Sequence, residues 1–523
     1  MRTSSDGNVK PDIDKRTPAV IIHGHFYQPP RENPWTGVVD VEPDAAPFPD
    51  WNERIHAECY RPNAQVSFID EQTGKRRIVN NYTHLSFNFG PTLLTWLEHT
   101  HPETYSQIIA ADAESRQRRG GHGNAIAQAY SHAILPLCNK RDRVTQVRWG
   151  LADFRYRFGR AAESMWLPET ACNHDILDLL IDEGMRYVIL APQQACRIRK
   201  NGEQEWQDVS SGQVDTGYSY QYRHRQNSQR SLAVFFYDQQ LAGAIAFDRA
   251  LASSSVLVDR FAGAVRGDGL VNVATDGESY GHHFKFGDLC LAHAFEVEMP
   301  ARGLRATNYG EYLDHHAPVA EIEIAHGEDG RGSSWSCTHG VGRWIRDCGC
   351  QTGGEAGWNQ KWRGPLRSAL DLVRDEAAVF FEETRGRLFI EPWTARNAAI
   401  ELILGQTDKV SFLNRHAPGA LSLSDQQRAL MFLEMQRHTI LMNASCGWFF
   451  NDISRIEPVQ VLKYAARAID LMEQLKLPFS RKRFLEILSE ARSNKPEPGN
   501  GADIYRRFVE SANPANQRAE ILI

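Results

Sequence analysis

From Pro18 to about Ala317, short apolar segments that favour β-strands alternate with amphipathic segments that favour helices. The predicted strands are AVIIHGHF, HLSFNFG, ESMWLPE, RYVILAP, AVFFYD and LVNVATDGE, at residues 19–26, 84–90, 163–169, 186–192, 233–238 and 270–278. The predicted helices span residues 92–97, 144–158, 174–184, 255–266 and 286–298. Alternation of this kind produces βαβ units and a parallel sheet, so we expect an α/β architecture with its chemistry at the carboxyl ends of the strands.

A different pattern follows the polar segment EIAHGEDGRGS at residues 323–333. From about Lys361 to Glu490 amphipathic helical runs dominate, and LRSALDLVRDEAAVFFEE and VLKYAARAIDLMEQLK are the clearest of them. A chain of 523 residues exceeds what one hydrophobic core usually supports. We therefore predict an α/β catalytic domain over residues 18–317 and a mostly helical domain packed on it over residues 318–490. Residues 491–523 are interpreted as a tail, with the incomplete end of a longer protein left open.

The composition limits which binding partners and which cellular compartment we expect. The formal net charge is −6 and no long basic run stands out, so we expect no nucleic acid partner. Residues 1–18 carry charges instead of an apolar stretch, and no run of about 18 apolar residues occurs, so we expect neither a secretory signal nor a membrane span. Nine cysteines fit reduced thiols better than a disulfide framework, which favours a cytoplasmic protein. The oligomeric state stays unknown.

The segment HGHFYQPPRENPW, at residues 23–35, ends the first predicted strand. His23 and His25 are two residues apart, so their side chains point to the same side of the strand. The prolines, arginine, glutamate and tryptophan that follow are poor material for a core. Two interpretations stay open from these residues: a metal site, or a site for a polar substrate that stacks on aromatic rings.

The segment MWLPET places a glutamate directly after another short apolar strand. Pro168 cannot continue a helix or a central strand, so we expect the chain to turn there and expose Glu169. Trp166 offers a flat apolar face of the kind that sugar rings pack against. The structural alternative is that Glu169 caps the helix predicted in CNHDILDLLIDEG.

The segment VATDGESYGHH, at residues 273–283, is the densest in ionisable groups. Asp276 and Glu278 alternate at a strand end, and His282 and His283 follow them. Four ionisable side chains directly after an apolar strand are costly to place near a core without a function. A solvated, charged loop is the alternative.

Residues 122–137, HGNAIAQAYSHAILPL, mix polar residues into a segment that we predict to be a buried helix. Asn124, Gln128 and His132 recur at a spacing of four and would share one helix face. A polar stripe of this kind suggests the wall of a cleft, although a surface-exposed face would look the same. Asp238, at the end of AVFFYD, adds another polar strand end.

Taken in order, HGHFYQPP, GHGNAIAQAYSHAILPL, WLPE and TDGESYGHH resemble the motifs of glycoside hydrolase family 57. The resemblance covers about residues 18–300 and continues into SSWSCTHGVGRW and a following helical domain. It implies an incomplete seven-stranded parallel β/α barrel and a retaining mechanism on α-glucans. The first motif departs from the commonest pattern, His-Gln-Pro, because Phe26 and Tyr27 stand between His25 and Gln28. That variant resembles a branch of the family that carries a C-terminal domain of unknown function, and it leaves the substrate open.

The resemblance also implies roles for single residues. Glu169 becomes the nucleophile and Asp276 the general acid/base, two carboxyls that a retaining enzyme holds about 5–5.5 Å apart. Their pKa values must be pushed apart, a task for which Glu278, His282 or His283 is suited. The residues expected to bind sugar are His23, His25, Gln28, Trp35, Asn124, Trp166, Asp238, Glu278, His282, His283, Trp335 and Trp344.

We therefore predict a retaining glycoside hydrolase or transglycosylase that acts on α-glucans, of the amylase, 4-α-glucanotransferase or branching type. It would use no cofactor and no catalytic metal, because two carboxylates suffice for the chemistry. One alternative is a zinc-dependent polysaccharide deacetylase or α-mannosidase-like enzyme, with His23, His25 and either Asp276 or His282 as ligands. The other alternative is a non-catalytic glycan-binding protein.

The segment SCTHGVGRWIRDCGC brings together Cys337, His339, Cys348 and Cys350. These are enough ligands for a tetrahedral metal site, but the spacing C-x-H-x8-C-x-C matches no standard zinc finger. We expect free thiols in a loop beside the active site, and metal binding is left open.

Overall fold

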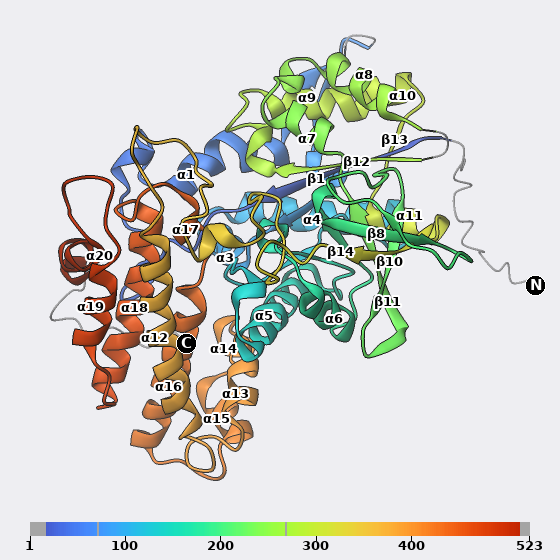
Figure 1. The fold of residues 1–523 in the computed structure, drawn as a ribbon. Coiled ribbons are helices and arrows are strands. Elements are labelled where there is room, and N and C mark those ends of the chain that lie inside the picture. Colours follow the sequence, from blue (N-terminus) through green and yellow to red (C-terminus); the bar gives the residue numbers. More distant parts are fainter. Residues whose placement is uncertain (1–16, 71–72, 267–268, 513–523) are drawn as a thin grey trace, which may run out of the picture.

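The computed structural model describes residues 17–70, 73–266 and 269–512. Most of their buried hydrophobic side chains belong to two large cores. Figure 1 shows an α/β part, coloured blue to yellow, beside a helical part in orange and red. This arrangement agrees with the predicted α/β domain followed by a helical domain. The last residues of the predicted tail, 513–523, lie outside the described residues. Within the described ranges, no helix is both long enough and apolar enough to cross a bilayer.

The α/β part is organised around a succession of parallel strands. The central strand β1 pairs in parallel with β12 on one side and β4 on the other. From β4 the succession continues through single bridges and short pairings to β5, β6, β7 and β11. The backbone N–H of Asp238, just after β11, donates to the carbonyl of Asn272 on β12. The strands are β1 (Ala19–Phe26), β4 (Ser86–Phe89), β5 (Ala127–Gln128), β6 (Met165–Trp166), β7 (Tyr187–Leu190), β11 (Asn227–Phe236) and β12 (Leu270–Asp276).

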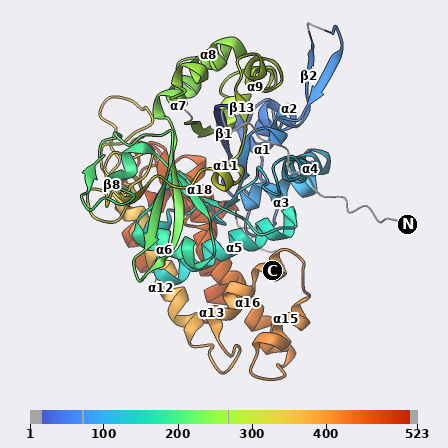
Figure 2. The same ribbon diagram turned by 90° about the vertical axis from the view of Figure 1, so that its right-hand side faces the viewer.

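Helices surround these strands at the positions that the sequence predicts, within a few residues at each end (Figure 2). They are α3 (Pro91–Thr100), α5 (Lys140–Phe158), α6 (His174–Asp182), α8 (Ser254–Ala264) and α9 (Gly287–His293), which a π-helix extends over Ala294–Glu298. Further helices that were not predicted are α1 (Trp51–Ile55), α2 (Arg61–Ala64), α4 (Pro102–Arg118), α7 (Gln239–Ala246), α10 (Met299–Ala301) and α11 (Tyr309–His315).

A second sheet, also not predicted, extends the first. Its strand order is β7-β11-β10-β14-β8-β9, so it shares β7 and β11 with the parallel strands. Its other members are β8 (Ala195–Lys200), β9 (Gln207–Asp208), β10 (Ser219–His224) and β14 (Ala320–Ile324), and the remaining strands are β2 (Val66–Ile69), β3 (Arg76–Val79) and β13 (Arg305–Ala306). Because β14 lies beyond residue 317 yet pairs within this sheet, the α/β part extends past the predicted boundary.

The helix predicted over residues 122–137 is wrong. The chain there is mostly extended, with the two-residue strand β5 and a short 3₁₀ turn at Leu135–Leu137. The spacing of four misled the prediction, because residues four apart share a face of a strand as well as of a helix. His132, with φ of 59°, also has a left-handed backbone that no helix accommodates.

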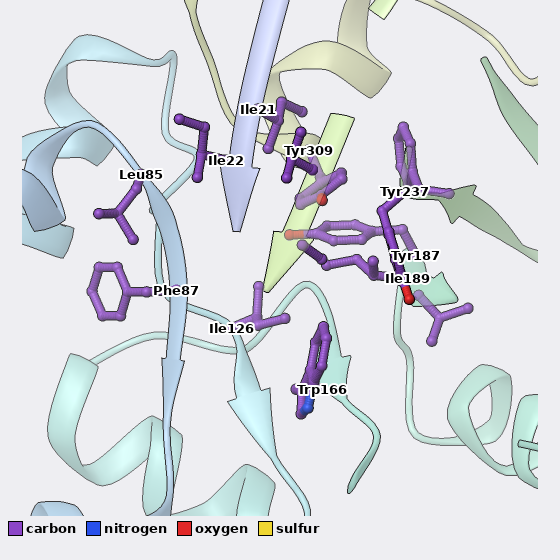
Figure 3. Close-up of a cluster of buried hydrophobic side chains, with 14 of the residues drawn as sticks. Ile21, Ile22, Leu85, Phe87, Ile126, Trp166, Tyr187, Ile189, Tyr237 and Tyr309 are labelled. Atoms are coloured by element: carbon purple, nitrogen blue, oxygen red, sulfur yellow. The ribbon is translucent and has the colours of Figure 1, made fainter. Parts of the chain in front are cut away.

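The core of the α/β part lies between the parallel strands. Figure 3 shows Trp166, Tyr187 and Tyr309 gathered there with Ile21 and Ile126. Tyr309, on α11, lies with its ring centroid 5.3 Å from that of Tyr187 and donates its hydroxyl hydrogen to Asn272 at 2.6 Å. Large side chains from β6, from β7 and from α11 therefore fill the interior beneath the carboxyl ends.

The helical part has its own core, which reaches into the α/β part. Its helices are α12 (Arg363–Glu382), α13 (Pro392–Ala398), α14 (Ile400–Ile403), α15 (Lys409–His416), α16 (Leu423–Leu441), α17 (Cys446–Phe449), α18 (Ile456–Gln474), α19 (Arg481–Ser489) and α20 (Gly501–Ile504). Trp35, Tyr130 and Trp149 from the α/β part are buried in the same cluster. The chain after residue 490 does not form a separate tail up to residue 512, because Ile504 and Val509 are buried in this core as well.

One buried ion pair joins the two parts. The Arg396 guanidinium on α13 donates to the Asp142 carboxylate on α5 at 2.7 Å and to the Thr145 hydroxyl at 2.8 Å. The side chain of Arg396 is only 2% exposed and that of Asp142 is 10% exposed. A pair so far from water holds the helices in register with α5, and removal of one partner leaves the other charge buried and unpaired.

We predict that Arg396→Met costs about 3–5 kcal/mol of stability, because Asp142 then keeps a buried charge without a partner. The measurement is guanidinium chloride denaturation followed by tryptophan fluorescence. Arg385→Met, which breaks the half-exposed pairs with Glu382 and Glu391, is the matched control and should leave the midpoint unchanged. Equal effects of the two substitutions would show that the buried pair does not hold the parts together.

Candidate active site

Glu169 lies in the 3₁₀ turn Pro168–Thr170, which follows the carboxyl end of β6 after Leu167. Its φ of 59° is left-handed, an unusual conformation for a residue other than glycine and one that is found where a site imposes it. The residue is 9% exposed, and its Oε2 accepts two hydrogen bonds, from Trp335 Nε1 at 3.0 Å and from Ser336 Oγ at 2.6 Å. The backbone N–H of Trp335 donates to the Glu169 carbonyl as well. Glu169 is thus held by the loop after β14 and does not cap α6, whose cap is Asn173.

Opposing effects set the charge of Glu169. The pKa of the Glu169 carboxyl is raised, because burial is the largest effect, and the hydrogen bonds from Ser336 and Trp335 and the charge of Arg343 offset only part of that rise. Hydrogen bonds donated to a carboxylate favour its ionised form. The loop that holds Glu169 therefore also supports its negative charge.

Asp276 is the last residue of β12 and lies opposite His25 in the register with β1. It is the one exposed residue of its strand, so water reaches its carboxyl. Surrounding protein nevertheless raises its pKa to about 7, first through loss of solvation and then through the negative charge of Glu169. Glu169 and Asp276, predicted from two separate motifs, are therefore close enough to interact electrostatically.

Glu278 follows Asp276 in the 3₁₀ helix Gly277–Tyr280 and is buried. Its Oε1 accepts hydrogen bonds from the Tyr60 hydroxyl at 2.7 Å and from the backbone N–H of Tyr27 at 3.1 Å. Burial raises its pKa to about 8, and the charge of Asp276 adds to the shift. Burial and the charge of Glu169 thus raise the pKa of Asp276, and the repulsion between Asp276 and Glu278 raises the pKa of Glu278.

His23 and His25 lie beneath the carboxyls and stack on Trp166, with ring centroids 4.8 Å and 5.0 Å from the indole. Both imidazoles are bound to β4 through Asn88. His23 Nε2 lies 3.1 Å from Asn88 Oδ1 and His25 Nδ1 lies 2.9 Å from Asn88 Nδ2. Ser86 Oγ, 3.0 Å from His23 Nδ1, completes the partners of His23.

The same chain of hydrogen bonds continues into the helical part. His25 Nε2 lies 3.0 Å from His132 Nε2, and His132 Nδ1 lies 2.7 Å from Ser445 Oγ. One arrangement of protons satisfies every ring nitrogen: His23 carries its proton on Nε2, His25 on Nε2 and His132 on Nδ1. Burial lowers the pKa of His23 and of His25 to about 3 and that of His132 well below its ordinary value. The three imidazoles are therefore neutral.

This network bears on the metal alternative. Each imidazole lone pair already accepts a hydrogen bond from Ser86, Asn88 or His25, so none is directed at a common point where a cation would sit. Two groups of side chains in the described part of the chain are spaced to hold a metal ion: Cys337, His339, Cys348 and Cys350 form one, and Glu53, His56 and His101 form the other. Neither includes His23, His25 or Asp276. The geometry of the donors favours a hydrogen-bonded platform over a zinc site at this position.

The predicted aromatic residues divide into two sets. Trp335 is partly exposed and lies against Trp166 and Tyr237, with ring centroids 5.2 Å and 6.2 Å away. Trp166 itself is buried beneath the histidines. The prediction that Trp35 and Trp344 bind sugar is wrong, because both are buried in the core of the helical part and present no face to a sugar. The Trp35 indole instead donates to Asp470 on α18 at 2.9 Å.

Several predicted polar residues have structural partners away from Glu169. Asn124 is fully buried between Tyr82 and Asn308, and Asp238 caps the start of α7. Gln28 accepts a hydrogen bond from Arg31 at 2.9 Å. His282 pairs with Glu58 and lies edge-on to Trp51, and burial lowers the pKa of its neighbour His283 to about 4.

Four residues that the structure places at the site are not among the predicted site residues. Asn88 binds His23 and His25, and Ser336 binds Glu169, as described above. The Tyr27 ring stacks on His132 at 3.7 Å, and Tyr237 lies near enough to Asp276 for that charge to help raise the pKa of its phenol. A signal existed for Asn88, a polar residue inside the apolar strand HLSFNFG. Ser336 carries no comparable signal, because its partner is distant in sequence.

Comparisons with known proteins agree with this architecture. Residues 16–325 match the model of glycosyl hydrolase family 57, and residues 358–520 match a domain of unknown function, DUF3536. A segment of 108 residues is 27% identical to alpha-amylase 1 of Dictyoglomus thermophilum. This segment covers 20% of this chain and 15% of that relative.

Two solved structures share the fold. One is an exo-type maltose-forming amylase from Pyrococcus sp. ST04, with a TM-score of 0.63 and 16% identity over 90% of this chain and 82% of that one. The other is a branching enzyme from Pyrococcus horikoshii, with a TM-score of 0.52 and 14% identity over 96% of this chain and 98% of that one. The family model spans more than half of the chain and includes both carboxyls. The chain therefore belongs to glycosyl hydrolase family 57.

Proposed function

We propose that this enzyme acts on α-glucans by a retaining double displacement, with Glu169 as the nucleophile and Asp276 as the general acid/base, on an incomplete seven-stranded barrel. The observation that carries the proposal is the difference between the two carboxyls. Burial raises the pKa of both carboxyls, but two hydrogen bonds that favour the Glu169 anion limit the rise there, while the pKa of Asp276 reaches about 7. A retaining glycosidase needs this combination of one ionised and one protonated carboxyl.

In the first step the Glu169 carboxylate attacks the anomeric carbon and the Asp276 carboxyl gives its proton to the leaving oxygen. The glycosidic bond breaks, and a glycosyl ester forms on Glu169. Loss of the charge on Glu169 then removes one of the two causes that raise the pKa of Asp276. Asp276 is thereby converted to a base at the stage at which a base is required.

In the second step Asp276 takes a proton from water or from a sugar hydroxyl, and that oxygen displaces Glu169. Water gives hydrolysis, and a sugar hydroxyl gives transfer, so amylase, 4-α-glucanotransferase and branching activities share the same intermediate. The α-glucan substrate is supported by the family and by the similar structures, whose names describe an amylase and a branching enzyme. The partly exposed rings of Trp335 and Tyr27 offer faces for sugar rings beside the carboxyls.

The substrate is tested by incubation with maltooligosaccharides and amylose, followed by chromatography of the products. Shortened chains alone indicate hydrolysis, and shortened together with lengthened or branched chains indicate transfer. Cello-oligosaccharides, which have β-linkages, are the matched control and should stay intact. Turnover of the β-linked chains only would overturn the α-glucan assignment.

For Glu169→Gln we predict a loss of turnover of about 10³-fold or more, because the substitution removes the attacking charge and almost no volume. Initial rates on the best maltooligosaccharide give the comparison. Glu183→Gln removes a carboxylate from the end of α6, where it pairs with Arg148 at 2.8 Å, and should retain wild-type rates. Turnover within tenfold of wild type in the Glu169 variant would exclude its role as the nucleophile.

For Asp276→Asn we predict a large loss on maltooligosaccharides and a small loss on an aryl α-glucoside with an activated leaving group, since that leaving group needs little protonation. Glu278→Gln is the matched control, because it changes the neighbouring carboxyl, and its losses should be similar on the two substrates. A leaving-group dependence that appears for Glu278→Gln instead would assign the acid role to Glu278.

We predict that kcat/KM falls on both the acidic and the basic side of a pH optimum. Activity requires protonated Asp276, so it decreases as the pH rises through about 7. Activity also requires ionised Glu169, so it decreases as the pH falls through the pKa of that group. Ser336→Ala removes a hydrogen bond that lowers the Glu169 pKa and should move the acidic limb to higher pH. Thr338→Ala, an exposed hydroxyl of the same loop, should leave the limb in place, and an equal shift there would disprove the cause.

A further inference from the structure

We propose that Cys337, His339, Cys348 and Cys350 bind a structural zinc ion beside the active site, a site that does not depend on the proposed function. The four ligand atoms lie within 4.8 Å of one another, and the loop that carries them follows directly from the residues that bind Glu169. Three cysteines and one histidine are a common ligand set of structural zinc sites.

Three separations between ligand atoms match tetrahedral coordination. Cys337 Sγ lies 3.8 Å from Cys348 Sγ and 3.8 Å from Cys350 Sγ, and Cys350 Sγ lies 3.5 Å from His339 Nδ1. An ion with Zn–S bonds of about 2.3 Å and a Zn–N bond of about 2.0 Å, at tetrahedral angles, separates its sulfurs by about 3.8 Å and a sulfur and nitrogen by about 3.5 Å. A disulfide would need sulfurs about 2.05 Å apart, and all the cysteines are free thiols.

The backbone supports the convergence of these ligands. Gly349, between Cys348 and Cys350, has a φ of +86°, a left-handed turn that a side chain would oppose. This turn directs both sulfurs toward Cys337, which is buried. The spacing C-x-H-x8-C-x-C, which matches no standard zinc finger, becomes a four-ligand set only after the loop closes on itself.

Two buried guanidinium groups beside the cluster supply a second, independent observation. Arg363 donates to the Cys350 carbonyl at 2.9 Å, and both Arg343 and Arg363 donate to the Phe449 carbonyl. Neither forms an ion pair with a carboxylate in the described part of the chain, although Arg363 is fully buried and Arg343 is 6% exposed. A zinc ion with three thiolates and a neutral imidazole carries a net charge of −1, which offsets this buried positive charge.

Binding releases protons and orders the loop. Zn²⁺ displaces the protons of three thiols, which pass to solvent, and His339 binds through its neutral Nδ1. Cys337 is the residue after Ser336 and two after Trp335, the two donors to Glu169. We infer that the ion fixes both donors. Only this consequence rests on the proposed role of Glu169.

The test is the metal content of the full chain, expressed with zinc in the medium and purified under reducing conditions without chelator. We expect about one zinc per chain by mass spectrometry of the metal. Cys348→Ser should lower that content at least about fivefold, since three remaining ligands bind less tightly. Cys196→Ser, a partly exposed thiol on β8 outside the cluster, is the matched control and should keep the full content.

Two measurements on the unaltered chain keep the proposal testable if Cys348→Ser fails to fold. Cobalt substituted for zinc should give the absorption bands of a tetrahedral thiolate site, and a thiol-blocking mercurial should release the metal into a chromogenic chelator. A wild-type chain that holds no zinc and takes up no cobalt would overturn the proposal, and so would a disulfide among the three cysteines. All these readouts are independent of catalysis. In the zinc-poor variant, the acidic limb of the pH profile should move upward as it does for Ser336→Ala, and an unchanged limb would reject only the link to Glu169.

Discussion

The two hydrogen bonds that Trp335 and Ser336 donate to Glu169 connect the distant parts of this site. Glu169 comes from the end of β6, and its donors come from a loop that begins after β14. The loop reaches Glu169 because Ser333 and Cys172 exchange two backbone hydrogen bonds, each 2.9 Å long. A displacement of this loop removes the support for the negative charge of Glu169 and leaves the effect of burial unopposed.

Charge at the site is confined to the carboxyls. The three imidazoles beneath them are neutral, because burial disfavours their charged forms and every ring nitrogen has a partner. The charge of Glu169 acts on Asp276 and the charge of Asp276 acts on Glu278, so ionisation of one carboxyl raises the cost of ionising the next. The hydrogen bonds of Glu169 favour its ionisation first, and this order is what a double displacement requires.

The helical part takes part in the site as well as in stability. Ser445, just before α17, binds His132 at 2.7 Å, and the thiol of Cys446 lies 3.7 Å from the Tyr27 hydroxyl. Tyr27 is one of the two residues that separate His25 from Gln28 in the first motif. The insertion therefore supplies a ring that contacts the helical part, which gives a physical reason for the two features to occur together.

Strand ends could be predicted from the sequence because their signal is local. An apolar segment that ends in Glu169 or Asp276 can be recognised from a few consecutive residues. Both carboxyls lie at the carboxyl ends of strands as expected. Contacts between distant segments could not be predicted. Nothing near Asn88 indicates His25, and nothing near Trp35 indicates that its indole faces Asp470 and not a sugar. The helix prediction for residues 122–137 is wrong for a different reason, since polar residues four apart fit a strand as well as a helix.

The most direct measurement is covalent trapping of the intermediate on Asp276→Asn. An activated 5-fluoro-α-glucosyl fluoride needs little acid assistance to leave, so it should load the nucleophile, while loss of the base slows release. Peptide mapping by mass spectrometry should then find one fluoroglucosyl group on Glu169, within the segment MWLPET. A label on Glu278 or another carboxyl would contradict the assignment of Glu169, and turnover that inverts the anomeric centre would contradict the double displacement itself.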